Sequence, residues 1–254
     1  MKILKNIFGA FWALWGILTF SVTLLIVVIP VCTTYFIKEP AGTEAFRQIS
    51  KAWMTVWLTL IGSPLKVVGK RNFEKGKNYV VVSNHNSLMD VPITTPFVPG
   101  PNKTIGKTSF AKTPIFGWVY VRGTVLVDRD SEESRRRSFE EMKKTLSQGL
   151  HMVIYPEGTR NRTADPLKSF HNGAFKLAVE SQKDIIPTLI FNTKNVLPLN
   201  KSFYLSPHRL EMHFLQAVSA KNITAKDLKE KVFKVMWDYY ENGIETKTNN
   251  KQNG

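Results

Sequence analysis

Cysteine is almost absent from this chain: Cys32 is the only one among 254 residues. A single thiol excludes a disulfide framework, a thiolate zinc cluster and C-x-x-C redox chemistry. Acidic residues are also scarce, because 20 Asp and Glu face 35 Lys and Arg, which gives a formal net charge of +15 at pH 7. Such an excess implies a polyanionic neighbour, either nucleic acid, an anionic membrane surface or a phosphorylated substrate. The apolar content of 43% excludes disorder as a description of the whole chain.

Charge is missing altogether from one long stretch near the N-terminus, between Ile7 and Ile37. A helix of this length, at ~1.5 Å per residue, exceeds the ~30 Å hydrocarbon core of a bilayer. It must tilt, bend at Pro30, or place its ends among the lipid headgroups. A cleaved signal peptide is the alternative, since Lys2 and Lys5 precede the stretch. The apolar run is longer than a usual signal, and no convincing cleavage site ends it, so we expect a retained membrane segment.

A second apolar stretch, residues 52–65, contains Trp53 and Trp57 and follows Arg47 and Lys51. Tryptophan beside basic residues is typical of the membrane interface. A core helix of the following domain explains the same pattern equally well. If both stretches form a hairpin, the rest of the chain returns to the side of the N-terminus. The two N-terminal lysines favour the cytoplasmic side, so we expect a cytoplasmic-membrane protein whose main domain faces the cytoplasm.

The remainder of the chain alternates short apolar runs with helical patterns. We expect strands at 79–83, 124–127, 152–155 and 185–190, and helices at 132–148, 170–181 and 224–240. Ser131 is placed to cap the first of these helices. The pattern predicts an α/β fold with a largely parallel central sheet flanked by helices. The stretch 209–215 alternates apolar and polar residues and is predicted as an edge strand.

These patterns divide the chain into three parts. Residues 1–65 form a membrane-associated helical segment of one or two helices, residues 66–245 form the α/β domain, and residues 246–254 form a disordered polar tail.

A histidine and an aspartate follow the first predicted strand of the domain. His85 and Asp90 are five residues apart, a spacing that would place them ~140° apart on a helix, so the chain must turn for them to meet. If they meet, the carboxylate fixes the tautomer of a general base and stabilises the imidazolium that forms. A lone histidine in a loop is more often an ordinary surface residue, and the strand end improves this signal only modestly.

A glycine and an arginine follow one further predicted strand. Glu157, Gly158, Thr159 and Arg160 come directly after the strand at 152–155. Glycine lets a backbone approach a ligand closely, and a guanidinium binds phosphate through two hydrogen bonds. A turn followed by a solvated basic loop is the plain alternative.

Two weaker signals accompany that block. Gly123 precedes the strand at 124–127, which delivers Asp128 and Arg129 at its end, and a surface ion pair explains this pair equally well. Lys107 follows Ile105 and Gly106, and it is otherwise one exposed lysine among many.

In their order along the chain, these blocks resemble those of the glycerolipid acyltransferase family, and the 1-acyl-sn-glycerol-3-phosphate acyltransferases most of all. The blocks are Asn84-His85-x4-Asp90, Gly123-x5-Arg129, Tyr155-Pro-Glu-Gly-Thr-Arg160 and Ile186-Pro187. The resemblance covers about residues 66–215, and the apolar N-terminal region is similar to that family's membrane-docking helices. Tyr155 stands where phenylalanine is frequent.

The resemblance implies a reaction. His85, held by Asp90, would remove the proton from the sn-2 hydroxyl of lysophosphatidic acid as this hydroxyl attacks an acyl thioester, which gives phosphatidic acid without a covalent acyl-enzyme. The acyl donor would be acyl-CoA or an acyl carrier protein. No metal and no cofactor are implied.

The resemblance also implies a binding set. Arg160, helped by Arg129 and Lys107, would bind the acceptor phosphate, and Glu157 would position the glycerol. The backbone around the headgroup would be shaped by Gly158 and Thr159, with Gly123 in the same substrate-binding set.

Two alternatives stay open at this point. The acceptor could be another lysolipid, for example the lyso-form of an amino-acid lipid. The chain could also be a membrane-tethered binding protein without enzymatic activity. No nucleic-acid fold signature is present, so membrane lipid, lysophosphatidic acid and the thioester carrier are the expected partners, and nucleic acid is not.

Overall fold

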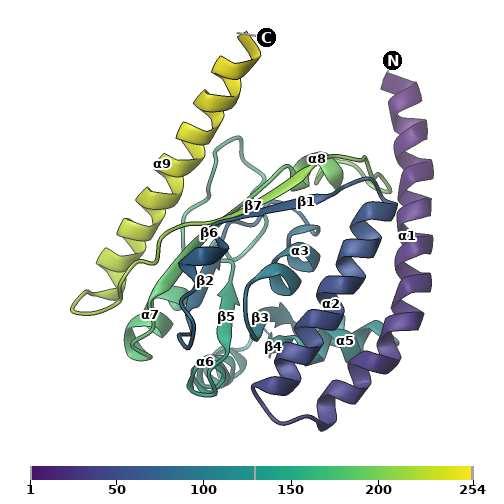
Figure 1. The fold of residues 1–254 in the computed structure, drawn as a ribbon. Coiled ribbons are helices and arrows are strands. Elements are labelled where there is room, and N and C mark those ends of the chain that lie inside the picture. Colours follow the sequence, from purple (N-terminus) through teal and green to yellow (C-terminus); the bar gives the residue numbers. More distant parts are fainter. Residues whose placement is uncertain (1, 129, 253–254) are drawn as a thin grey trace.

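Parallel strands form the centre of the protein (Figure 1). The computed structural model describes residues 2–128 and 130–252. The strands are β1 (Leu65–Val68), β2 (Val80–Ser83), β3 (Asn102–Lys107), β4 (Thr124–Val127), β5 (His151–Ile154), β6 (Ile185–Phe191) and β7 (Leu210–Phe214). They form one sheet in the order β1-β7-β6-β2-β5-β3-β4. Only the β6–β7 pair is antiparallel among these described strands, so the predicted α/β fold with a largely parallel sheet is confirmed.

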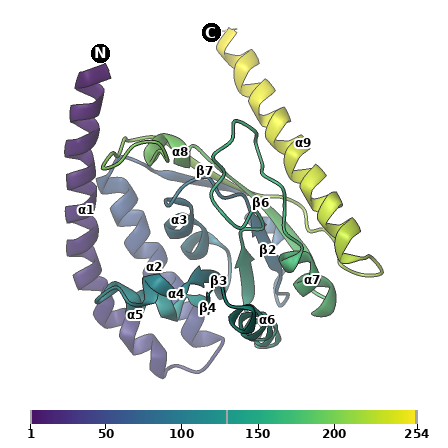
Figure 2. The same cartoon turned by 180° about the vertical axis from the view of Figure 1, so that it is seen from behind.

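Helices cover both faces of this sheet (Figures 1 and 2). They are α1 (Lys2–Thr33), α2 (Ala41–Leu60), α3 (Asp90–Phe97), α4 (Thr108–Ala111), α5 (Phe116–Arg122), α6 (Glu132–Ser147), α7 (Gly173–Glu180), α8 (Thr193–Val196) and α9 (Ala225–Gln252), with the short 3-10 turns η1 (Thr34–Phe36) and η2 (Lys70–Asn72). The predicted cap at the start of α6 is present, because the Ser131 side chain accepts a hydrogen bond from the Ser134 N–H.

Two apolar cores lie on the two faces of the sheet. Consecutive residues of β2 show the separation, since Val81 belongs to the core beneath α1, α2 and α3, whereas Val80 and Val82 belong to the core beneath α6, α7 and α9. This follows from the period of two in a strand, which turns successive side chains to opposite faces. Each fully buried aliphatic side chain stabilises the fold by about 1.5–3 kcal/mol.

The N-terminal helix α1 packs along α2 and leaves most of its apolar side chains exposed. Among the described residues, the helical stretch Ile3–Phe36 is long and apolar enough to cross a membrane. The two tryptophans of α2 face α1: the Trp53 Nε1–H donates to Thr23 Oγ1 at 2.8 Å, and the Trp57 Nε1–H donates to the Gly16 carbonyl at 3.0 Å. Both indoles are buried, so the core alternative for this stretch is the one that the structure supports.

Some elements differ from the expectation. β7 lies inside the sheet rather than at its edge, because β1 pairs with it in parallel and takes the edge position. β1 is only four residues long and half-exposed, so its sequence lacks the apolar run that predicts a buried strand. The helix α9 continues to Gln252, through most of the stretch where a disordered tail was expected, since neither glycine nor proline interrupts residues 244–252. Residues 253 and 254 lie outside the described residues.

Candidate active site

The predicted site lies where neighbouring parallel strands end. β2 and β5 pair in parallel, so the loops that follow them begin side by side at the carboxyl-terminal ends of the two strands. The two loops are joined through the backbone of His85. Its carbonyl accepts a hydrogen bond from the Asn161 N–H at 2.7 Å, and its own N–H donates to Glu157 Oε1 at 2.8 Å. The first and third sequence blocks therefore form one structural unit.

His85 and Asp90 meet, and the chain makes the turn between them that their spacing requires. The chain turns after β2, and Asp90 begins α3, so its carboxylate reaches back to His85 Nδ1 at 2.8 Å. The same oxygen, Oδ2, also accepts the N–H groups of Asn86 at 2.5 Å and Ser87 at 2.7 Å. Asp90 is fully buried, and the His85 side chain is 16% exposed. Because the carboxylate only accepts, Nδ1 carries the proton and Nε2 presents a free lone pair, which is the arrangement of a positioned general base.

The imidazole of His85 is supported from below by Tyr155. Their rings stack with centroids 4.5 Å apart and an interplanar angle of 27°. The Tyr155 hydroxyl donates to Thr94 Oγ1 at 2.9 Å, and the Thr94 hydroxyl donates to the Asp90 carbonyl at 2.6 Å. Burial raises the pKa of Tyr155 above its ordinary value, so the phenol stays neutral and keeps its proton for Thr94. The sequence shows only that Tyr155 stands where phenylalanine is frequent in the family that it resembles, and it does not reveal this hydroxyl link.

A second residue that sequence reasoning missed is Asn84, which holds the start of the loop. Its side-chain amide donates to the Ile190 carbonyl at 3.0 Å, and its Oδ1 accepts the Ile190 N–H at 2.7 Å. The pair replaces a stretch of strand ladder between β2 and β6. An asparagine directly before His85 was the only signal in the sequence.

Glu157 has a different role from the one expected. Its side chain is fully buried, and its two oxygens accept backbone N–H groups, Oε1 from His85 at 2.8 Å and Oε2 from Lys168 at 3.1 Å. Burial raises the pKa of this carboxyl, and the two N–H donors partly offset the effect. Glu157 therefore ties two loops together and does not present its carboxylate to a glycerol group.

The next two residues shape the loop. Gly158 has a φ of 70°, and a Cβ added there would lie 2.8 Å from His171 Cδ2. Both features require glycine at this position. Thr159 is exposed, and its hydroxyl oxygen accepts a hydrogen bond from Lys168 Nζ at 2.8 Å.

Cationic side chains lie near the same carboxyl-terminal ends of the strands. Arg160 is half-buried and makes no hydrogen bond or ion pair with any described residue, so its guanidinium is free to bind an anion. Lys107 is exposed at the end of β3, the strand next to β5, and Lys168 adds a cation that sequence reasoning did not single out. Arg129 lies outside the described residues.

Gly123 belongs to a different part of the molecule. Gly123 precedes β4, so it lies at the amino-terminal end of the parallel strands. The predicted site residues follow the carboxyl-terminal ends of these strands. A Cβ added to Gly123 would lie 2.6 Å from the Phe46 ring. Gly123, which the sequence placed in the substrate-binding set, lines an apolar cavity and does not lie beside Arg160.

This cavity has a volume of about 350 Å³ and lies between α2, α3, α5 and the strands β3 and β4. Its lining is almost entirely apolar. Leu88 and Val91, which flank Asp90 in sequence, belong to its wall, so the cavity adjoins the loop of the His85–Asp90 pair. A chain of methylene groups fits such a lining, because each buried methylene contributes ~0.8 kcal/mol.

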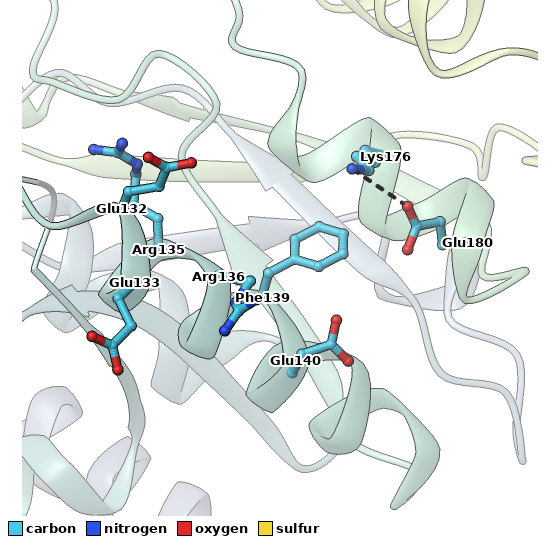
Figure 3. A pocket seen from close by; sticks show the side chains of 8 residues that line it. All are labelled: Glu132, Glu133, Arg135, Arg136, Phe139, Glu140, Lys176 and Glu180. Carbon is cyan, nitrogen blue, oxygen red and sulfur yellow. Dashed lines mark ion pairs between the residues drawn. The ribbon is translucent and has the colours of Figure 1, made fainter.

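A second hollow, shown in Figure 3, lies between α6 and α7 and measures about 630 Å³. Charged side chains of both signs surround Phe139 there, and Lys176 pairs with Glu180 at 3.7 Å. None of the predicted site residues lines it. Within residues 2–128 and 130–252, no group of three or more His, Cys, Asp and Glu side chains is placed to hold a metal ion.

Comparison with known proteins finds relatives that share one activity in their names. The 1-acyl-sn-glycerol-3-phosphate acyltransferase of Saccharomyces cerevisiae is 27% identical over 207 residues, which cover 74% of this chain and 65% of the yeast protein. The 1-acyl-sn-glycerol-3-phosphate acyltransferase alpha of Mus musculus is 30% identical over 171 residues, 66% of this chain and 60% of the mouse protein. The chain thus spans less than two thirds of the length of these relatives.

The fold has a close counterpart in the crystal structure of the 1-acyl-sn-glycerophosphate (LPA) acyltransferase PlsC from Thermotoga maritima. The two structures superpose with a TM-score of 0.79 at 22% sequence identity, covering 95% of this chain and 97% of the other. The model of the Acyltransferase family matches residues 64–191, from the start of β1 to the end of β6, and includes His85, Asp90 and the block around Arg160. On this match over half of its length, the chain belongs to the Acyltransferase family.

Proposed function

We propose that this protein transfers an acyl group from an acyl thioester to the sn-2 hydroxyl of lysophosphatidic acid, giving phosphatidic acid. The observation that carries the proposal is the 2.8 Å contact between His85 Nδ1 and the buried Asp90, beside an apolar cavity and a free arginine. Relatives named for this reaction support it.

The chemistry follows from the free lone pair on His85 Nε2. This atom accepts the proton of the acceptor hydroxyl as the hydroxyl oxygen attacks the thioester carbonyl. The new C–O bond forms, the C–S bond breaks, and the proton passes from Nε2 to the departing thiolate of the carrier. Asp90 stabilises the imidazolium in between. General-base catalysis of this kind contributes about 10²–10⁴-fold to a rate, and no side chain needs to carry the acyl group.

The acceptor phosphate is assigned to the cations at the sheet edge. Arg160 is the principal ligand because it is half-buried and unpaired among the described side chains. Lys107 and Lys168 border the same edge, and Arg129 follows β4 in sequence. Charge-assisted hydrogen bonds of a guanidinium to phosphate are short and about twice as strong as neutral ones.

The acyl chain of the donor is assigned to the apolar cavity, with its thioester beside His85. The carrier is coenzyme A or an acyl carrier protein. The acceptor and the product are lipids, so the site must work at a membrane surface. We place the protein on the cytoplasmic membrane through α1, with the catalytic domain on the cytoplasmic side, in keeping with the apolar stretch Ile3–Phe36 and the N-terminal lysines.

The test is a matrix of donors and acceptors on the purified full chain in detergent. Donors are acyl-CoA and acyl carrier protein thioesters of one chain length, and acceptors are lysophosphatidic acid, a lyso-amino-acid lipid and monoacylglycerol. We expect strong preference for the acceptor that carries a phosphate monoester. Equal turnover of the lyso-amino-acid lipid would assign the protein to that acceptor, and no transfer with any pair would contradict the proposal.

The matched variants are His85→Ala and His208→Ala. His208 is exposed and makes only a 3.4 Å contact from its ring to a backbone carbonyl, so its removal leaves transfer unchanged. His85→Ala is expected to lower kcat by about 10²–10⁴-fold. Activity of His85→Ala within a few-fold of the parent would remove the general base from the mechanism.

A further inference from the structure

The catalytic domain carries an exposed apolar segment of its own, at residues 108–122, which comprise α4, the following loop and α5. Four of its large side chains face outward: Phe110 is 45% exposed, Ile115 37%, Trp118 61% and Val121 38%. Several large exposed apolar side chains within one short segment indicate an interaction surface.

The loop within this segment is strained. Ile115 has a φ of 63° and a ψ of −56°, a conformation that β-branched residues rarely adopt. The Phe116 N–H donates to the Pro114 carbonyl at 2.6 Å across Ile115, which closes a three-residue γ-turn. Ile115 belongs to neither of the two apolar cores, and 37% of its surface is exposed. Backbone strain of this kind is concentrated at functional sites.

The segment is continuous with the exposed face of the N-terminal helices. α5 contacts α1, and both views show the two side by side (Figures 1 and 2). The Tyr35 hydroxyl donates to the Trp118 carbonyl at 2.7 Å, and this contact joins η1 to α5. The adjoining Phe36 is 90% exposed. The apolar surface of α1 therefore extends over η1 onto the catalytic domain.

The exposed charges within residues 108–122 and at the adjoining end of β3 are positive. No acidic residue occurs between Asp90 and Asp128 or before Glu39 in the sequence. Two lysines of the first interval, Lys107 and Lys112, are exposed, whereas Arg122 is buried and pairs with Glu39 at 2.9 Å. Apolar side chains bordered by exposed lysines complement a bilayer surface that contains anionic lipid.

We propose that residues 108–122 form a second membrane-inserting element, and that an anionic phospholipid bilayer is the partner that covers this surface. Phe110, Phe116 and Tyr120 of this element also line the apolar cavity. Insertion therefore places the wall of the cavity among the lipid headgroups. That this cavity takes the acyl chain rests on the proposed function, whereas the insertion itself does not.

Depth measurement tests the insertion without any activity assay. The full chain with Cys32→Ser is given one cysteine at a time, by Trp118→Cys, by Leu18→Cys on the exposed face of α1, or by Val68→Cys on the opposite edge strand β1. Each variant is labelled with a fluorophore and reconstituted into vesicles of phosphatidylglycerol and phosphatidylcholine that carry nitroxide acyl chains. We expect quenching of the labels at positions 118 and 18, and none at position 68.

Two outcomes would overturn the proposal. The first is an unquenched label at position 118 beside a quenched label at position 18, because α1 alone would then bind the bilayer. The second is energy transfer between labels at position 118 in detergent without lipid, because a second copy of the chain would then cover the surface.

Ile115→Gly gives a functional test with a built-in fold control, since glycine removes the apolar side chain and relieves the strained turn. Ile115 does not line the cavity. We expect an unchanged or higher Tm, several-fold lower turnover of vesicle-borne lysolipid, and unchanged turnover of short-chain soluble substrates. Val68→Ser is the control for loss of an exposed apolar side chain. Equal turnover of vesicle-borne lysolipid by Ile115→Gly and the parent would contradict the proposal. A chain without transferase activity on any substrate would defeat the proposed function and leave the quenching result standing.

Discussion

Glu157 Oε1 accepts the backbone N–H of His85 at 2.8 Å, so the loop after β5 holds the loop after β2 in place. The other oxygen of the same carboxylate accepts the Lys168 N–H. A buried carboxylate with two backbone donors acts as a clamp on the loops. The position of the general base thus depends on a residue that has no exposed atom of its own.

The clamp predicts how Glu157→Gln alters the kinetics. A glutamine amide group can accept only one of the two N–H groups and turns its own NH2 toward the other, so the His85 loop loses its position. We expect kcat to fall by about tenfold or more, from the loss of a buried hydrogen bond of ~1–3 kcal/mol, with the KM for the acceptor unchanged. Steady-state kinetics at varied acceptor concentration measure both. A raised acceptor KM with normal kcat would instead make Glu157 a ligand of the substrate.

Asp90→Asn separates charge from geometry at the general base. The amide oxygen can still accept the N–H groups of Asn86 and Ser87, so the turn persists, but no negative charge stabilises the imidazolium of His85. We expect kcat to fall by about 10²–10⁴-fold while the Tm changes little. Asp165→Asn is the matched control, because Asp165 is exposed and outside the site. Near-normal turnover by Asp90→Asn would mean that the aspartate only shapes the loop.

Arg160→Ala tests the assignment of the phosphate. A charge-assisted hydrogen bond is worth about 1.5–3 kcal/mol, so its loss is expected to raise the acceptor KM about 10–100-fold. The effect on kcat is expected to be small, because the guanidinium binds the phosphate rather than the reacting hydroxyl. Arg162→Ala, an exposed arginine two residues away, serves as the control. An acceptor KM that does not change in Arg160→Ala would refute the phosphate role.

The His85–Asp90 pair could be predicted from the sequence because its geometry is local. One turn after a strand brings the two side chains together, and a single run of residues contains the whole arrangement. The α/β order was readable for a similar reason, since β2, β5 and β6 are apolar runs of strand length. β3 was missed because its polar and glycine residues hide its strand pattern.

The roles of Glu157 and Gly123 could not be predicted, because both depend on distant partners. Glu157 meets an N–H group 72 residues away, and only the pairing of β2 with β5 brings the two together. Gly123 and Arg129 share one sequence block, but the strand β4 (Thr124–Val127) lies between them in sequence, and Gly123 stands before its first residue. A motif gives the spacing of residues along the chain. It does not show that residues before and after a strand lie at its two different ends.

Gly123 provides a prediction about the length of the acyl chain that the protein prefers. A side chain at this position meets the Phe46 ring, which lies 2.6 Å from the site of an added Cβ, and it fills part of the apolar cavity. We expect Gly123→Ala to shift the preference toward shorter acyl donors and Phe46→Ala to shift it toward longer ones, with the acceptor KM unchanged in both. A series of donors from short to long chains measures this preference. Identical donor profiles for both variants and the parent would place the acyl chain elsewhere.

His151 predicts how the stability of the fold depends on pH. Its ring is buried at the start of β5, and Nδ1 accepts the Tyr79 N–H at 3.0 Å, which requires the neutral imidazole. Burial lowers the pKa of His151 to about 4. In the unfolded chain its pKa is about 6.5, so between these two values the unfolded state binds more protons than the folded state. Stability from this group is complete above about pH 6.5 and decreases as the pH falls toward 4.

The loss amounts to about 3 kcal/mol across this window, from ~1.36 kcal/mol for each unit of pKa difference. Thermal unfolding of the full chain in detergent between pH 4 and 7 measures it as a Tm that falls with pH. In His151→Gln the glutamine oxygen can still accept the Tyr79 N–H without titrating, so this variant is expected to lose most of the slope. His208→Gln, which changes an exposed ring, is expected to keep it. Equal slopes in all three proteins would show that His151 does not govern the acid sensitivity of the fold.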